Sequence, residues 1–276
     1  MNRDVLPRIG YRKAKDIRRR DIVAILDDIV DRGAPIAANR AFEVIRKMFN
    51  FAIERDIIDS SPCYMVKKPA EENRRDRILT AGEIVRFWNG LSDTAISMPV
   101  QLAVKFVLVT AQRKGEVINA GWKEFDLDAG WWTIPAERAK NKMSHRVPLS
   151  SMALDILNEL KAYPIESEFL FPSPSTDGPI LDTAVDRAIR RNRERLVIEY
   201  FTPHDLRRTA ASHMTSIGIS RLVISKILNH VESGVTAVYD RHSYDKEKRN
   251  ALDAWCRRLN EILTGADNIL EFRLPF

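Results

Sequence analysis

The stretch TPHDLRRTAASHM, residues 202–214, contains a well-defined helix start. Thr202 can cap the helix, a proline follows at the first helical position, and Asp205 stands where a capping box needs an acid. His204 and Arg207 are then neighbours on one helix face. Because a helix N-terminus favours anions, a neutral donor beside a fixed cation there suits a phosphate. An ordinary solvated first turn is the alternative at this point.

Helical patterns continue on both sides of this stretch. Apolar residues recur every three or four positions in residues 21–32, which end before Gly33, and again in the segment that Pro35 opens. Further helices are predicted at residues 100–110 (a buried one), 152–162, 182–195 and 220–229, and from about 245. Two short β-branched and aromatic segments, GWWTIPAER and HRVPLS, predict a small antiparallel sheet whose turn is AKNKMS. The sequence therefore predicts a mainly α-helical protein with one small sheet.

A polar segment divides the chain into two predicted domains. KKPAEENRRDR, residues 67–77, contains a proline and lacks hydrophobic periodicity, which is typical of a linker. Thr80 and Glu83 have the spacing of a capping box and start the next helix. We therefore expect a small helical domain at 1–66 and a mixed α+β domain at 78–276. The second domain would end in a helix and in an apolar tail after Gly265, which would lie in a groove of its own or another subunit.

The charge of the chain points towards a polyanion. The 276 residues carry 44 Lys+Arg against 38 Asp+Glu, a net charge of +6. Residues 1–80 contain 18 of these basic residues and 13 of the acidic ones, so the first third holds most of the excess. A basic module beside a nearly neutral one is typical of nucleic-acid binding, although mildly basic proteins are common. On the helix after Pro35, the polar face with Arg40 and Lys47 could lie on DNA or be solvated.

Several function classes find no support. Cys63 and Cys256 are far apart and offer neither a disulfide framework nor metal-type spacing, and the histidines show no zinc pattern. No apolar run reaches the length of a membrane span, and no signal peptide opens the chain. We therefore expect a cytoplasmic protein that does not bind a membrane. We also expect His145 and His242 to be exposed and His213 to be a core histidine.

Four separate segments contribute the candidate site residues. These residues are Arg113 and Glu116 in TAQRKGE, Lys140 and Lys142 in the strand turn, His204 and Arg207, and His230, Tyr239 and Tyr244 in ILNHVESGVTAVYDRHSYD. Glu116 can hold Arg113 through a charge-assisted hydrogen bond. With these residues in this order behind a basic helical module, the chain resembles the tyrosine recombinases, the phage integrase family. It is most similar to the integrases of genomic islands and P4-like satellite phages.

The resemblance implies a site-specific recombinase that cleaves and rejoins DNA through a 3′-phosphotyrosyl intermediate and needs no metal or ATP. It would integrate or excise a mobile element. The two arginines would offset charge on the scissile phosphate, since a planar guanidinium matches two phosphate oxygens. Tyr239 would be the nucleophile, Lys140 the general acid, His204 the proton acceptor, and His230 a further hydrogen-bond donor to the phosphate.

Neighbouring residues compete for two of these roles. Lys142 competes with Lys140 and otherwise contacts the DNA backbone. Tyr244 competes with Tyr239 and otherwise lies at the surface or anchors packing.

The sequence also departs from the family pattern. Asn229 stands where relatives often have glycine. Relatives of the island type also carry an N-terminal arm-binding domain, which we expect to be absent here. We also expect the core-binding domain to be truncated at its N-terminus. Either the sequence is part of a longer protein or the natural protein lacks the arm domain.

The resemblance also implies partners and rival functions. The partners would be double-stranded DNA at attachment core sites, three further copies of the chain, and DNA-bending and directionality proteins. A type IB topoisomerase and a resolvase of chromosome dimers share the phosphotyrosyl chemistry. A non-catalytic DNA-binding regulator would use the arginines only to hold phosphates, and it has no need of a tyrosine nucleophile.

Overall fold

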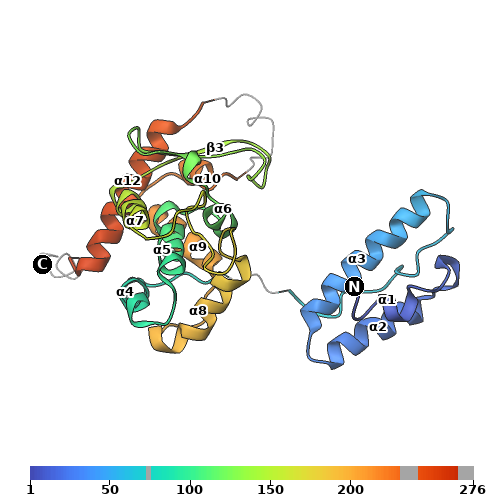
Figure 1. Cartoon of the computed structure of the whole chain (residues 1–276). Helices are drawn as coiled ribbons and strands as arrows, with labels where there is room; N and C mark the ends of the chain where they lie inside the picture. Colours follow the sequence, from blue (N-terminus) through green and yellow to red (C-terminus); the bar gives the residue numbers. More distant parts are fainter. Residues whose placement is uncertain (73–75, 231–241, 267–276) are drawn as a thin grey trace, which may run out of the picture. The chain divides into compact units, whose positions relative to one another are not determined.

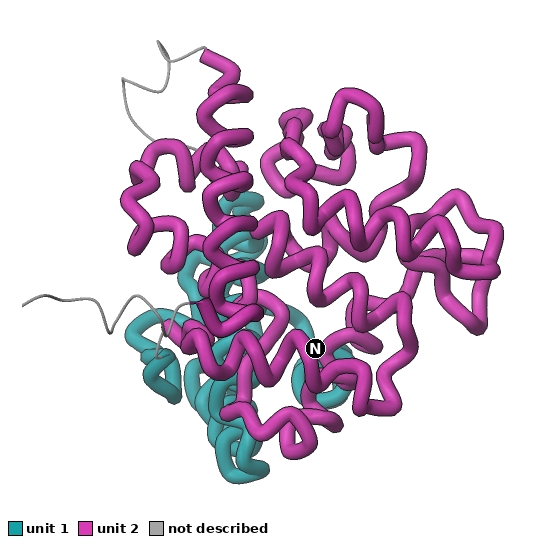
Figure 2. The backbone as a smooth tube through the Cα atoms, turned by 90° about the vertical axis from the view of Figure 1, so that its left-hand side faces the viewer, with its two compact units in different colours: residues 1–75 teal, residues 76–276 magenta. Residues whose placement is uncertain are grey.

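Helices make up most of the chain, and their order is shown in Figure 1. The computed structural model describes residues 1–72, 76–230 and 242–266. The chain forms two compact units, residues 1–75 and 76–276, which Figure 2 distinguishes by colour. The predicted class, mainly helical with a small antiparallel sheet, is confirmed.

The first unit is built on two helices that share one apolar core. Its helices are α1 (Leu6–Ile9), a 3₁₀ turn (Ala14–Asp16), α2 (Arg19–Asp31) and α3 (Pro35–Glu54). The core stripe of α2 includes Ile22 and Ile29, and that of α3 includes Phe42, Ile45 and Phe49, all buried. The two stripes pack on each other. Gly33 adopts a φ of 80°, which lets the chain turn sharply between these helices.

The segment predicted as a linker makes specific bonds at both of its ends. Asn39 is fully buried on α3, and its carboxamide donates to Ala70 O (2.8 Å) and accepts from Ala70 N–H (3.1 Å). These bonds attach the beginning of the segment to the first unit. At its other end, Arg77 pairs with Glu83 of the second unit. The predicted capping box is also present, because Glu83 N–H donates to Thr80 Oγ1 (3.3 Å) and Thr80 N–H donates to the Glu83 carboxylate (3.0 Å).

The second unit surrounds one buried helix. Its elements are α4 (Ala81–Gly90), a 3₁₀ turn (Leu91–Asp93), α5 (Met98–Thr110), α6 (Lys114–Ile118), a 3₁₀ turn (Trp122–Glu124), β1 (Phe125–Asp126), β2 (Trp131–Ile134), β3 (His145–Pro148), α7 (Ser151–Lys161), α8 (Asp182–Leu196), α9 (Pro203–Ser216), α10 (Arg221–Ile227) and α12 (Asp245–Thr264). Helix α5 contacts α6, α7, α8, α9 and α12. It is apolar on almost every side because it lies in the core, as the sequence predicted.

The sheet is antiparallel in the order β1-β2-β3. Trp132 pairs with Val147 and Ile134 pairs with His145, which confirms the two predicted strands and the turn between them. Strand β1 was not predicted, because two residues are too few to show an alternating pattern. The sheet is attached to α5 through aromatic side chains: the Trp132 ring lies 5.6 Å from that of Phe106.

Helix α12 closes the second unit against α5 and α9. Trp255 is fully buried, and its indole N–H donates to Leu108 O on α5 (3.0 Å). The His213 ring of α9 stacks on the Trp255 ring with centroids 5.6 Å apart. His213 is thus a half-buried packing residue. These contacts fix α9, which carries two of the candidate site residues.

We expect Phe49→Ala to lower the stability of the first unit by about 3–5 kcal/mol, because it leaves a cavity in a core that cannot collapse fully. The loss should appear as faster hydrogen exchange of the α2 and α3 backbone amides, measured by mass spectrometry. Phe51→Ala is the matched control on the same helix. Phe51 is 52% exposed, so its truncation should change stability by only about 0.5 kcal/mol. Equal exchange in the two variants would contradict the assigned core.

Candidate active site

The turn between α5 and α6 presents Arg113. This residue is the N-cap of α6, and its guanidinium Nη1 donates to Glu116 Oε1 (2.8 Å). Its backbone N–H donates to the other carboxylate oxygen of Glu116 (3.2 Å). Glu116 is only 4% exposed, so a buried carboxylate orients both the backbone and the side chain of Arg113. The ion pair expected between these residues is therefore present, and the catalytic role of Arg113 stays a prediction.

The start of α9 is fixed by Asp205. Its carboxylate is fully buried and accepts from the backbone N–H and the hydroxyl of Thr202, each at 2.8 Å. Arg208 donates to its other oxygen (2.7 Å). Burial opposes ionisation of Asp205, but these hydrogen bonds outweigh it and lower the pKa of the carboxyl. An ionised Asp205 thus sets the first turn of α9, from which His204 and Arg207 project.

Arg207 is a buried cation, only 3% exposed. Its Nη1 donates to Ala111 O at the end of α5 (2.9 Å), and its Nη2 donates to Leu228 O just after α10. Burial and the nearby positive charge of Arg113 lower the pKa of Arg207 to about 9, which leaves it protonated at neutral pH. The structure therefore keeps two cations close together, where they favour an anion.

Three consecutive backbone carbonyls at the end of α10 receive the side chains of this region. We call residues 227–229 the α10 carbonyl turn. Ile227 O accepts from Gln112 Nε2 (2.9 Å), Leu228 O accepts from Arg207, and Asn229 O accepts from Arg113 Nη2 (3.3 Å). The last carbonyls of a helix lack partners within the helix and carry the negative end of its dipole, so they suit cationic donors. One short helix end thus contacts both arginines.

His145 also binds the α10 carbonyl turn, and its predicted exposure is wrong. It is 6% exposed, and its ring Nε2 lies 3.0 Å from Ile227 O. Since a carbonyl only accepts, Nε2 carries the proton of this bond. The first residue of β3 faces inward with Val147, so the alternation of the strand buries it. Burial, with the nearby Lys248 charge, lowers the pKa of His145 to about 4.

The two candidate histidines are exposed beside the arginines. His230 follows the α10 carbonyl turn, and its Nε2 lies 3.4 Å from Arg207 Nη2. Partial burial, then the charges of Arg207 and Arg113, lower the pKa of His230. Partial burial, then the charges of Arg208 and Arg207, lower the pKa of His204. Both rings are therefore mainly neutral at pH 7 and can accept a proton.

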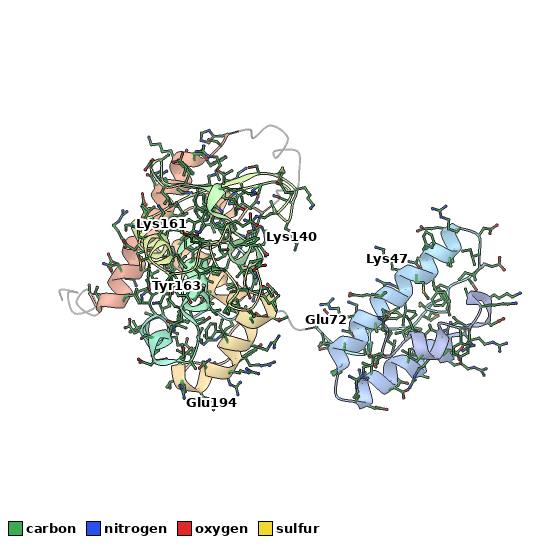
Figure 3. The ribbon with its side chains drawn as sticks, in the orientation of Figure 1. Lys47, Glu72, Lys140, Lys161, Tyr163 and Glu194 are labelled. Atoms are coloured by element: carbon green, nitrogen blue, oxygen red, sulfur yellow. The ribbon has the colours of Figure 1, made fainter. Side chains whose placement is uncertain are left out.

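The turn between β2 and β3 carries the candidate lysines. Lys140 projects from this turn and is exposed (Figure 3). Lys142 is also exposed, and its ammonium donates to Glu137 O (3.3 Å) within the same turn. Between them, the Asn141 carboxamide pairs with that of Asn229. The lysine turn is thereby joined to the α10 carbonyl turn, a contact that the sequence did not reveal.

Of the two candidate tyrosines, the structure describes only Tyr244. Tyr239 lies outside the described residues, so its predicted role as nucleophile is a proposal from the sequence. Tyr244 precedes α12, is half-buried, and packs its ring against His242, with ring centroids 4.7 Å apart. The Lys226 ammonium lies 4.8 Å from the Tyr244 ring. These contacts agree with a packing role for Tyr244.

Both units of the chain match models of known protein families. A model of the phage integrase family matches residues 77–246, and a model of the phage integrase central domain matches residues 1–69. The chain belongs to the phage integrase family. Every described candidate for the catalytic step lies in the part that matches the first model.

Three known integrases are similar to this phage integrase chain. It is 28% identical to prophage integrase IntZ of Escherichia coli, over 98% of this chain and 67% of the relative. It is 26% identical to the integrase of Enterobacteria phage P4, over 91% and 61%. A lambda integrase tetramer bound to a Holliday junction shares the fold, with a TM-score of 0.63 and 23% identity over 83% of this chain and 66% of that one. The chain thus spans about two thirds of the length of the curated relatives.

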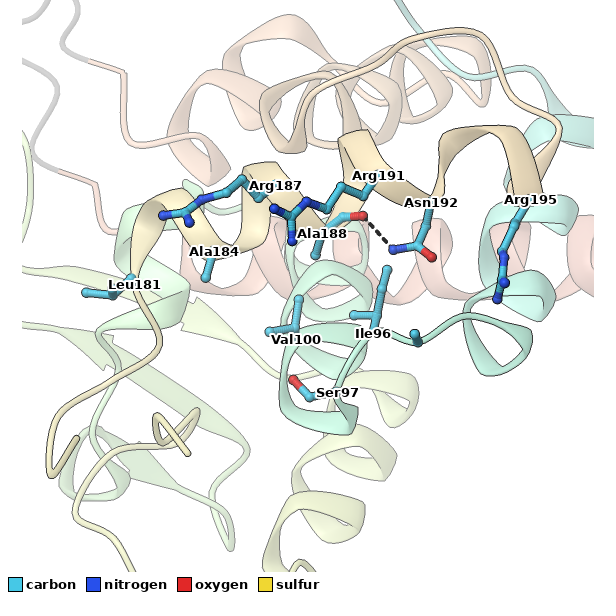
Figure 4. A pocket seen from close by; sticks show the side chains of 11 residues that line it. Ile96, Ser97, Val100, Leu181, Ala184, Arg187, Ala188, Arg191, Asn192 and Arg195 are labelled. Atoms are coloured by element: carbon cyan, nitrogen blue, oxygen red, sulfur yellow. Dashed lines mark hydrogen bonds between the residues drawn. The ribbon is translucent and has the colours of Figure 1, made fainter. Parts of the chain in front are cut away.

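Other features of this integrase chain lie apart from the site. A cavity of about 640 Å³ between α8 and the start of α5 is lined by Arg187, Arg191 and Arg195 and by none of the site candidates (Figure 4). In the part of the chain that the structure describes, no cluster of three or more acidic, histidine or cysteine side chains could hold a metal ion. None of the helices described is long and apolar enough to cross a membrane.

Arg40 and Lys47 belong to the first unit. Lys47 is exposed on α3 (Figure 3). Arg40 pairs with Glu43 and Glu72, each at 3.1 Å. Because DNA would have to replace these partners of Arg40, we expect Lys47 to gain more from a phosphate than Arg40 does. Their predicted role in DNA binding stays a proposal.

We expect the stability of the second unit to fall as the pH decreases from about 6.5 to about 4. His145 has a lowered pKa in the folded state, so the unfolded chain binds a proton that the folded chain rejects in this window. Above pH 6.5 His145 has no effect of this kind. Below pH 6.5 its protonation lowers the free energy of unfolding by at most about 3 kcal/mol. His145→Gln keeps an N–H donor but does not titrate, so urea unfolding between pH 7.5 and 4.5 should show a shallower decrease.

His242→Gln is the matched control for this measurement. His242 is exposed and pairs with the solvent-accessible Glu247 carboxylate (3.2 Å), and an exposed ion pair contributes little to stability, so its replacement should change the pH dependence much less than His145→Gln does. If His145→Gln and the wild type lost stability in parallel over this range, the buried neutral state of His145 would be wrong.

Proposed function

We propose that this chain is a site-specific DNA recombinase that cleaves and rejoins DNA through a 3′-phosphotyrosyl intermediate. It would integrate or excise a mobile element. The observation that carries the proposal is the pair of guanidinium groups, Arg113 and Arg207, bound to adjacent carbonyls of the α10 carbonyl turn beside two histidines whose pKa is lowered. Membership of the phage integrase family supports the same reaction.

The arginines would stabilise the charge that builds on the scissile phosphate. During attack on phosphorus, the non-bridging oxygens gain negative charge, and fixed cations in a partly dry site offset it without reorganisation. Each guanidinium uses only part of its five-donor set on backbone carbonyls, and the other N–H groups would bind the phosphate. His230, at 3.4 Å from Arg207, would add a hydrogen bond to the same phosphate.

The cleavage step needs a nucleophile and two proton transfers. The Tyr239 oxygen would attack phosphorus and give its proton to His204, whose lowered pKa keeps the ring neutral at pH 7. The bond to the 5′-oxygen breaks, and the Lys140 ammonium would give that oxygen its proton. The phosphotyrosyl bond keeps the energy of the broken phosphodiester, so an incoming 5′-hydroxyl can reverse each transfer without ATP.

The proposed partners are double-stranded DNA with attachment core sites and three further copies of the chain. The similar lambda integrase was solved as a tetramer on a Holliday junction, which supports strand exchange between four subunits here. DNA-bending and directionality proteins would act with them in the bacterial cytoplasm. The basic first unit, including Lys47 and Arg40, would contact the core-site backbone, and binding would weaken steeply with salt.

Covalent trapping without metal tests the proposed chemistry. The protein is mixed in EDTA with nicked, partly randomised duplexes, and protein-linked DNA is recovered in detergent. We expect an adduct on Tyr239, located by mass spectrometry, that Tyr239→Phe abolishes because the nucleophilic oxygen is absent. Sequencing the linked DNA would reveal the preferred core site.

Tyr244→Phe is the matched control, since Tyr244 is the neighbouring tyrosine with packing contacts of its own. It should retain the adduct. An adduct on Tyr244 would keep the reaction but correct the nucleophile. Clear DNA binding at low salt without any adduct would favour a non-catalytic DNA-binding regulator.

A further inference from the structure

We propose that the carboxamide pair of Asn141 and Asn229 positions Lys140 for proton transfer. The pair would hold the lysine turn at a fixed distance from the two arginines. The two asparagines act through Lys140 and are positioning residues, which do not touch the reacting atoms. This inference rests on the proposed recombinase function.

The pair is a reciprocal contact between two loops far apart in sequence. Asn141 Nδ2 donates to Asn229 Oδ1 (2.7 Å), and Asn229 Nδ2 lies 3.4 Å from Asn141 Oδ1. Asn141 Oδ1 also accepts from the Met143 backbone N–H (3.1 Å). The Asn141 side chain therefore shapes its own turn and attaches that turn to the α10 carbonyl turn.

Asn229 connects the lysine turn to an arginine within a single residue. Its side chain bonds to Asn141, while its carbonyl accepts from Arg113 Nη2 (3.3 Å). Its backbone has a φ of 48°, a conformation that asparagine tolerates better than most residues. The positive φ and the two bonds together fix the direction of the Asn229 side chain towards the lysine turn.

Lys140 depends on this attachment because its own side chain has little support. Its ammonium has no hydrogen-bond or ion-pair partner among the residues that the structure describes, and the residue is exposed. The preceding Ala139 is buried, so the chain leaves the core at Lys140. The next residue, Asn141, is the first point at which the turn is held again. A general acid must lie within hydrogen-bond reach of the leaving oxygen, so the placement of this turn affects its efficiency.

The base of the same strand pair has a second attachment to the α10 carbonyl turn, which does not use the two asparagine side chains. His145 bonds to Ile227 O at the start of β3, and the β2–β3 ladder runs from there. Loss of the asparagine pair should therefore release the tip of the turn and leave the sheet and the arginines in place. This separation allows a selective test of the pair.

The test compares two leaving groups in the cleavage step. One duplex has an ordinary scissile phosphodiester, and the other has sulfur in place of the bridging 5′-oxygen. A thiolate leaves readily without a proton, so only the ordinary substrate needs a general acid. We expect Asn141→Ala to cleave the ordinary duplex about 10- to 100-fold more slowly than wild type. On the sulfur duplex its rate should lie within about threefold of wild type, as should that of Lys140→Ala, since neither needs the acid there.

Asn229→Gly removes the other carboxamide without backbone strain, because glycine readily adopts a positive φ. It should reproduce the pattern of Asn141→Ala. The double variant should be no slower than either single variant, because both remove the same contact. Asn192→Ala is the matched control: its carboxamide bonds only to Ala188 O of α8 (2.9 Å) among the described contacts, and it should cleave both duplexes at the wild-type rate.

The outcomes separate this inference from the proposed function. If wild type cleaves both duplexes while the asparagine variants lose neither rate, or lose both equally, the inference is wrong and the recombinase remains. Additive losses in the double variant would likewise overturn it. If wild type forms no covalent product with either duplex, the proposed function is wrong, and this inference with it.

Discussion

The hydrogen bonds that the end of α10 accepts are the constraint on which the rest of the site depends. A helix of seven residues ends in carbonyls with no partner in the helix itself. Here those carbonyls accept from the strand pair through His145 and from the two arginines, which come from the ends of other helices. Segments that are more than 100 residues apart in sequence therefore meet at one turn. Any shift of α10 would move all of them together.

Electrostatics explains why this turn is needed. Arg113 and Arg207 repel each other, and burial makes the Arg207 cation more costly still, as its lowered pKa shows. Glu116 and the carbonyls offset this cost without neutralising both cations. A surplus of positive charge therefore remains at a surface-accessible point next to His204 and His230. Under the proposed function a phosphate would satisfy that surplus, so ordinary polar contacts within the fold would provide the anion site.

The sequence predicted the fold better than the contacts between its parts. Helix periodicity and the capping residues Thr80 and Thr202 are local signals, so the helices and the strand pair could be located. The predicted exposure of His145 was wrong, because the sequence does not show on which face of the sheet the first residue of a strand lies. The partner of Asn229 could not be found either, since it lies 88 positions away and no local pattern records it. Tyr239 was proposed as the nucleophile only through the family resemblance.

The most direct test of the central claim removes charge from the phosphate instead of from the protein. We would measure cleavage by Arg113→Ala on a duplex whose scissile phosphate is replaced by a neutral methylphosphonate. If the arginines act on phosphate charge, this variant should be slow on ordinary DNA and recover most of the wild-type rate on the neutral group, which needs less positive charge. Equal slowing on both substrates would contradict the claim and leave Arg113 a purely structural residue.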